Sequence, residues 1–443
     1  MSALRLVITA FAALWFGATA ALAIDIKEVT TPLGIKAWLV EDKSTPVVAL
    51  SFSFAGGGSA AEPDAQRGIT SLTAEMLTDG AGPFNAFAFR QRMEEASVSF
   101  GFGASLDRLN GSLRALSANL GDSVELLRLA MMEPRFDADQ LDQRRAQTLS
   151  ALNQAQQRPG SVAERALMNA EFAGYPYAVD PQGSRETLQT LTPTDLKKRA
   201  AALLTRNGLL VAAVGDISAA ELARQLDRAF GDLPVGEAKP ALPDWTPPAK
   251  GRSIMIERPA PQSAVLFAMP GLMRNDPDWY AYIVMSHILG GGMQSRLFTE
   301  VREKRGLAYS VSSSPRTYRK AALFRISTGS ATERTPEAIR VIRAELVRLQ
   351  AEGVTDQELA EAKTFLTGSL ALSLDSSGSV AGLLHGMQID GLPRDHLDRR
   401  SALIAAVKAE DVLRVARRVL REEMITTVVV GRQTVKAPPA TQD

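Results

Sequence analysis

Residues 290–310 read GGGMQSRLFTEVREKRGLAYS, and no other stretch of the chain is as informative. The three glycines precede a pattern that predicts an amphipathic helix ending in a charged turn. Gly306 is placed to end this helix and to let the chain turn into a strand. Arg302 and Tyr309, seven residues apart, then lie on the two sides of that turn.

The string from Ser295 to Tyr309 resembles the second domain of the pitrilysin family of zinc peptidases, which includes insulinases and mitochondrial processing peptidases. In that family the matching arginine and tyrosine grip the substrate backbone near the metal, so the resemblance implies substrate binding by Arg302 and Tyr309. Donors of this kind contribute about 10²–10³ in rate each when they face a developing oxyanion. The alternative interpretation is an ordinary helix terminus with a solvated arginine and a half-buried tyrosine.

The same resemblance implies a first domain whose helix carries the zinc motif HxxEH, with a third, acidic ligand further along the chain. The two histidines bind zinc from one helix face, and the glutamate between them activates the zinc-bound water. Gly68, Met76 and Leu77 align this chain with that helix. The four chemical positions then fall on residues that together cannot hold zinc at useful strength, namely Ser71, Ala74, Glu75 and Ala151.

Histidine and cysteine usage offers no other place for a catalytic zinc. The chain has no cysteine, which excludes thiolate ligands, and it has only three histidines. His287 and His385 lie on apolar helix faces, where a hydrogen-bonded core histidine is the commoner interpretation, and His396 lies in a charged loop. We therefore expect no metal in this chain, and the resemblance places the zinc in a partner subunit.

The sequence repeats itself at long range. The tetrapeptide GSVA at 160–163 recurs at 378–381, and Leu141 has a counterpart in Leu359 at the same offset. Landmarks that recur in order at one offset predict a duplicated domain. Between the copies, the proline-rich stretch 236–251 is typical of a linker. The predicted first domain therefore covers residues 24–235, and the second covers residues 252–443.

Strand and helix patterns are grouped rather than strictly alternating, which favours an α+β fold with mainly antiparallel sheets. The family resemblance implies the same architecture: two homologous domains, each a sheet covered by helices, facing each other across a cavity. In catalytic relatives the edge of the strand that matches residues 47–54 pairs with the peptide substrate by β-augmentation. The glycine-rich segment 55–59 that follows is otherwise a loose turn.

The N-terminal segment and the net charge indicate where the protein is located. The formal net charge of +1 gives no electrostatic footprint for nucleic acid or an anionic membrane. The chain opens with a short positive region, an apolar run from Leu6 to Ala20 and a small-x-small site, so we expect a signal peptide at 1–23 cleaved after Ala23. An uncleaved anchor is the alternative. We expect a periplasmic or secreted bacterial protein with no membrane span in its mature chain.

These observations lead to one functional hypothesis and two rivals. The first is a non-catalytic, substrate-binding subunit of a heterodimeric zinc metallopeptidase that acts on peptides, with zinc and HxxEH supplied by a homologous partner. The second is a peptide-binding or scaffold protein of the same fold with no role in proteolysis. The third, a peptidase active alone, has almost no support because no acid–base–metal set survives.

Overall fold

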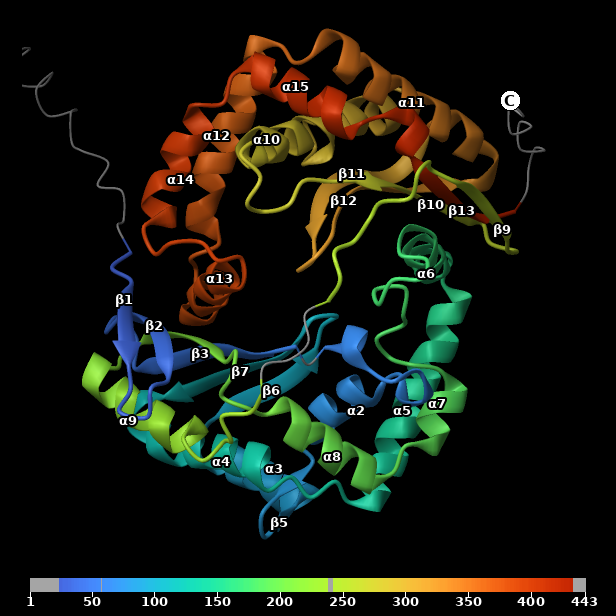
Figure 1. Cartoon of the computed structure of the whole chain (residues 1–443). Helices are drawn as coiled ribbons and strands as arrows, with labels where there is room; N and C mark the ends of the chain where they lie inside the picture. The colour runs from blue at the N-terminus through green and yellow to red at the C-terminus, as the bar shows by residue number, and fades with distance from the viewer. Residues whose placement is uncertain (1–23, 57, 238–241, 433–443) are drawn as a thin grey trace, which may run out of the picture.

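The computed structural model describes residues 24–56, 58–237 and 242–432. The predicted signal peptide and its cleavage site after Ala23 lie outside these residues. Within them, no helix is both long enough and apolar enough to cross a bilayer. Two halves, each with a sheet and helices, lie one above the other in Figure 1, the first in blue to green and the second in yellow to red.

The first half is built on a six-stranded sheet with the order β1-β2-β8-β3-β7-β6. Neighbouring strands are antiparallel except β2 and β8, which run parallel. The strands are β1 (Lys27–Thr30), β2 (Lys36–Glu41), β3 (Val47–Ala55), β6 (Ser99–Ala104), β7 (Arg108–Leu116) and β8 (Leu210–Gly215). A separate small hairpin joins β4 (Gly80–Ala81) to β5 (Phe84–Asn85).

The second half is built on a five-stranded sheet with the order β11-β12-β10-β13-β9. Its neighbours are antiparallel except β13 and β9. The strands are β9 (Ser253–Glu257), β10 (Gln262–Pro270), β11 (Ala308–Thr317), β12 (Ala322–Ala331) and β13 (Thr426–Gly431).

The two sheets share one topology. Taken from β9, the second order is β9-β13-β10-β12-β11, and it matches β2-β8-β3-β7-β6 of the first sheet strand by strand. The single parallel pair occupies the same place in both sheets. The predicted fold class, α+β with two similar domains and mainly antiparallel sheets, is therefore confirmed.

Helices cover both sheets (Figure 1). The first half contributes α2 (Ile69–Met76), α3 (Ala86–Glu95), α4 (Leu120–Met132), α5 (Ala138–Gln157), α6 (Pro159–Glu171), α7 (Arg185–Thr190), α8 (Pro193–Leu203) and α9 (Ala219–Phe230). The second half contributes α10 (Trp279–Gly290), the π-helical turn η4 (Phe298–Glu303), α11 (Thr335–Glu352), α12 (Asp356–Leu372), α13 (Ser377–Ile389), α14 (His396–Ala405) and α15 (Ala409–Val419).

One helix from each half packs on the sheet of the other half. Helix α6 lies against β10 and β13, and α13 lies against β3 and β8. Both helices carry the repeated GSVA near their start, and its alanines, Ala163 and Ala381, are fully buried. A methyl side chain allows a helix to approach a sheet closely, so the repeat marks the contacts that join the halves.

The structure corrects one prediction about peptide pairing. The strand at 47–54 is β3, which is hydrogen-bonded to β7 on one side and to β8 on the other. Its backbone groups are already paired, so it has no edge to offer a peptide. The strands at the ends of the two sheets are β1, β6, β9 and β11.

Candidate functional site

The segment that carries Arg302 and Tyr309 folds as its sequence predicts. Helix α10 ends at the glycines, and the chain becomes helical again from Arg296 through η4. Gly306 has a φ of 60°, in the left-handed region that favours glycine, and the chain turns there into β11. Since β11 is the last strand of its sheet, Tyr309 lies at an open sheet edge.

Arg302 and Tyr309 are both exposed, and Tyr309 keeps 65 % of its surface in solvent. The Arg302 guanidinium carbon lies 4.8 Å from the centre of the Phe298 ring, which is a cation–π contact. Neither side chain makes a hydrogen bond or an ion pair with another residue in the described ranges. Their donors are therefore free to bind a ligand.

A buried ion pair fixes the helical turn that presents Arg302. Arg296, at the start of the turn, donates to both carboxylate oxygens of Glu358 on α12, at 2.6 and 2.7 Å. It also donates to the carbonyl of Gly353 at 2.8 Å. Burial opposes ionisation of Glu358, but the hydrogen bonds from Arg296 and Thr355 and the charge of Arg296 together outweigh it and hold the pKa of Glu358 below its ordinary value. The sequence pattern contains Arg296 but does not reveal this role.

The degenerate zinc positions lie in the first half, on α2 and α5, which pack together. The Ser71 hydroxyl donates to the carbonyl of Pro181 at 2.7 Å, and Ala74 is buried. Glu75 and Ala151 are exposed on their helices. Two of the four positions have no ligand atom and a third is engaged with the backbone, so this set does not fit zinc.

An ion pair joins α2 to α5 in this region. Arg144 on α5 binds both carboxylate oxygens of Asp79, just after α2, at 2.6 and 2.7 Å. Desolvation raises the pKa of the nearby Glu75, with Arg144 opposing the shift and Asp79 adding to it. No group of three histidine, aspartate or glutamate side chains that could hold a metal occurs in the part of the chain that the structure describes.

The structure places the two predicted sets apart. Ser71, Ala74 and Glu75 lie on α2 in the lower half of Figure 1, and Tyr309 lies on β11 in the upper half. No single site within this chain therefore unites the zinc positions with the Arg302–Tyr309 pair.

The three histidines are core-like rather than exposed. His287 on α10 stacks on Phe365 with ring centres 4.4 Å apart, and burial lowers its pKa. His385 on α13 is buried and lies 2.7 Å from the Ser53 hydroxyl. The prediction that His396 lies in a loop is wrong, because this residue begins α14 and is buried against Tyr280.

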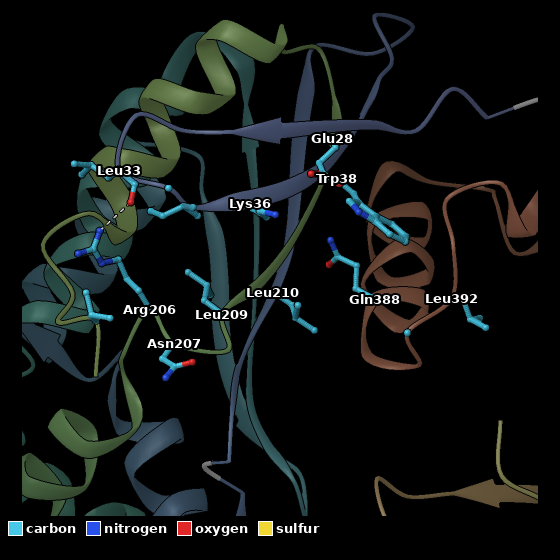
Figure 2. Close-up of a pocket in the computed structure, with 14 residues that line it drawn as sticks. Glu28, Leu33, Lys36, Trp38, Arg206, Asn207, Leu209, Leu210, Gln388 and Leu392 are labelled. Atoms are coloured by element: carbon cyan, nitrogen blue, oxygen red, sulfur yellow. Dashed lines mark hydrogen bonds between the residues drawn. The ribbon is translucent and has the colours of Figure 1, made fainter. Parts of the chain in front are cut away.

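Cavity volume does not mark the predicted site. A cavity of about 780 Å³ lies where the β1–β2 hairpin and the start of β8 meet the end of α13 (Figure 2). Trp38, Lys36 and Arg206 line it from the first half, and Gln388 lines it from the second. None of the predicted site residues borders it. The candidate site is the surface around Arg302 and Tyr309, because their side-chain donors make no hydrogen bond within the described ranges.

Comparisons with known proteins agree on the family. A family model described as Insulinase (Peptidase family M16) matches residues 37–180. A second model, described as Peptidase M16 inactive domain, matches residues 190–366.

Relatives are similar over most of the chain. An uncharacterized zinc protease of Streptomyces coelicolor is 27 % identical, over 91 % of this chain and 89 % of its own. A Helicobacter pylori protein described as a non-peptidase homolog is 28 % identical, over 80 % of this chain and 82 % of its own. The crystal structure of a peptidase M16 inactive domain from Pseudomonas fluorescens matches with a TM-score of 0.87 and 28 % identity, covering 94 % of this chain and 99 % of that one. The chain therefore belongs to peptidase family M16, the insulinase family, as a member that lacks the HxxEH motif.

Proposed function

We propose that this chain is the non-catalytic, substrate-binding subunit of a two-chain zinc peptidase that acts on peptides. The partner is a homologous chain that carries HxxEH and the zinc. One observation carries the proposal: Arg302 and Tyr309 keep free donors on an exposed surface, while the residues at the zinc positions cannot hold the metal.

The surroundings of the pair suit a peptide ligand. The Phe298 ring orients the Arg302 guanidinium, and the Arg296–Glu358 ion pair fixes the turn beneath it. An arginine and a tyrosine can both donate to a peptide carbonyl. The adjoining β11 is an edge strand, whose unpaired backbone groups can bind an extended chain. The Arg302–Tyr309 pair would then hold a peptide while the partner's zinc acts on it.

A second surface suits the partner subunit. The outer face of α12 carries Phe365, 53 % exposed, and Leu372, 78 % exposed. At the offset that relates Leu141 to Leu359, the matching positions on α5 are Gln147 and Gln154, also exposed. The same place in the duplicated fold is therefore polar in one half and apolar in the other. The fold does not require an apolar face here, and exposed apolar patches are typical of protein interfaces.

The proposal includes export. The positive start, the apolar run and the small-x-small site of residues 1–23 support a cleaved signal peptide and a periplasmic or secreted protein. Mass determination of the native protein should give a chain that begins at Ile24. A native chain that retains residues 1–23 would contradict export by cleavage.

The test is peptide cleavage by a purified HxxEH-bearing homologue, with and without this chain. Addition of the chain should raise kcat/KM, and Arg302→Ala or Tyr309→Phe should each reduce the gain by about 10-fold or more. Arg305→Ala is the matched control, because this neighbouring arginine is already paired with Glu300. If the chain never changes cleavage by any partner that it binds, the scaffold hypothesis replaces this one.

A further inference from the structure

A second cavity, of about 680 Å³, lies between the two halves at the tips of two hairpins. The β6–β7 tip contributes Asp107 and Arg108 from the first half, and the β11–β12 tip contributes Arg319 from the second. Arg274, which follows β10, and Asp390, which follows α13, complete its charged lining. The cavity is eight residues along β11 from Tyr309, roughly 26 Å at the usual rise of a strand, so it is a separate site.

The acidic groups of this cavity are already engaged. Asp107 accepts a hydrogen bond from the Tyr177 hydroxyl at 2.7 Å and one from the backbone N–H of Arg319 at 3.2 Å. Asp390 lies 3.6 Å from the guanidinium of Arg274, which makes an ion pair. Asp390 is thus paired with Arg274, whereas Asp107 keeps its charge but accepts no hydrogen bond from the guanidinium of Arg108 or Arg319 among the described residues.

Arg108 and Arg319 have no carboxylate partner of their own. Arg108 donates only to neutral oxygens: the Ser53 hydroxyl at 2.6 Å, the Ser53 carbonyl at 3.3 Å and the Gly208 carbonyl at 2.8 Å. These bonds use its Nε and Nη2 and leave Nη1 without a partner among the described residues. The Arg319 side chain likewise makes no hydrogen bond or ion pair within the described ranges.

The two guanidinium groups are close enough to repel each other. Burial, with a smaller effect from the charge of Arg319, lowers the pKa of Arg108 to about 10, although Asp107 opposes the shift. Guanidinium groups prefer planar anions such as carboxylates, to which they can donate two parallel hydrogen bonds. Three arginines line the cavity with only two carboxylates, and Arg108 and Arg319 have no carboxylate partner of their own, so this pair is arranged for an anion.

The rest of the lining combines apolar surface with four polar side chains, those of Ser105, Asn110, Asn275 and Thr317. Leu106 and Met273 line it beside the ring of Tyr318, and Ile389, which is 44 % exposed, closes one side. A small inorganic anion would leave these walls without a partner, whereas a carboxylate on an apolar body would contact both kinds of surface.

We propose that this cavity binds the carboxylate of an apolar acid, with Arg108 Nη1 and Arg319 as the donors. Two sources share this chemistry: the C-terminal residue of a peptide and a free aliphatic acid. Because Arg108 and Arg319 come from different halves, the bound carboxylate would bridge the two domains. The site does not involve Arg302, Tyr309 or a partner subunit, so it can hold even if the proposed function fails.

The experiment is isothermal titration calorimetry on the full mature chain with three probes. They are N-acetyl-leucyl-leucine, its C-terminal amide and hexanoate. The free peptide acid should bind with one site, and the amide should bind about 10-fold more weakly or not at all, because charge-assisted hydrogen bonds are lost. Tighter binding of the peptide acid than of hexanoate assigns the site to peptide C-termini, and equal binding assigns it to free acids.

Arg319→Gln should weaken binding of the free acid about 10-fold. The variant should melt no lower than the wild type, because Arg319 is exposed and its side chain holds nothing in place. Arg316→Gln, near the end of β11 but outside the cavity, is the control and should bind normally. Equal binding of acid and amide, or unchanged binding by Arg319→Gln, would overturn the proposal.

Discussion

Acidification should loosen the packing between the two halves through His385. This histidine lies on α13 of the second half, and its Nε2 is 2.7 Å from the hydroxyl of Ser53 on β3 of the first half. The Arg108 guanidinium donates to the same hydroxyl oxygen at 2.6 Å. The Ser53 oxygen accepts from Arg108 and keeps its one hydrogen, which it can donate to Nε2 of a neutral His385. Burial next to the positive charge of Arg108 favours this neutral form of His385 in the folded protein.

The same geometry sets the pKa. Burial, with a smaller effect from the charge of Arg108, lowers the pKa of His385 from 6.5 to about 4. Between these values the unfolded chain binds a proton that the folded chain does not. Stability is therefore fully present above pH 6.5, and it is lost as the pH falls toward 4.

The linkage relation gives the size of the effect. At pH 5 the mismatch between a pKa of 6.5 and one of about 4 lowers the free energy of unfolding by about 2 kcal/mol relative to pH 7. The full loss, reached below pH 4, is about 3 kcal/mol for this one group.

The assay compares the wild type with His385→Gln, which can still accept from Ser53 but cannot titrate. Urea unfolding at pH 7 and pH 5 should show that the wild type loses about 2 kcal/mol more than the variant. With only three histidines in the chain, an NMR titration of the imidazole protons resolves each one, and the variant assigns His385. A measured pKa of 6.5 or above for His385, or an equal loss of stability in both proteins, would refute the reasoning.

Three further perturbations test the fold and the surfaces. Phe365→Gln with Leu372→Gln should lower the free energy of unfolding by about 1 kcal/mol, chiefly through the lost stack of Phe365 on His287, and should weaken capture of the partner subunit; unchanged capture contradicts the interface. Arg296→Met should destabilise by roughly 2 kcal/mol in urea, because its carboxylate partner on α12 is left half-buried and unpaired. Ala381→Leu should lower the free energy of unfolding by about 1–3 kcal/mol through overpacking. Gly382→Ala should not lower it, because the added methyl group would contact no other atom.

Local patterns in the sequence predict local structure well. Gly306 marks the turn into β11 because few other residues adopt its backbone conformation without strain. The repeated GSVA indicates a duplication, and the two sheets have the same strand order. No local pattern shows that the alanines of this repeat face the opposite half, since these contacts depend on residues of the other half of the chain.

The sequence-based predictions are wrong where segments that are distant in the chain determine the local structure. The strand at 47–54 is an inner strand of its sheet, because β8, at 210–215, lies between it and β2. His396 is flanked by Asp395, Asp398 and Arg399, so its surroundings resemble a charged loop, yet it begins a helix whose apolar side includes the fully buried Ile404. The carboxylate cavity is beyond sequence reasoning altogether, because separate turns and loops from both halves supply its lining.

Helix α2 shows why this fold can lack a metal and keep its shape. Its buried side chains, Ile69, Leu72 and Met76, point to the core, and Glu62 accepts from the backbone N–H groups at its start. Of the four zinc positions only Ala74 belongs to this core, to which it adds a methyl group. Packing therefore holds the helix whether or not a ligand set is present. Arg302 and Tyr309 differ from these residues, because they are exposed and the fold does not depend on them, which agrees with the substrate-binding role proposed for them.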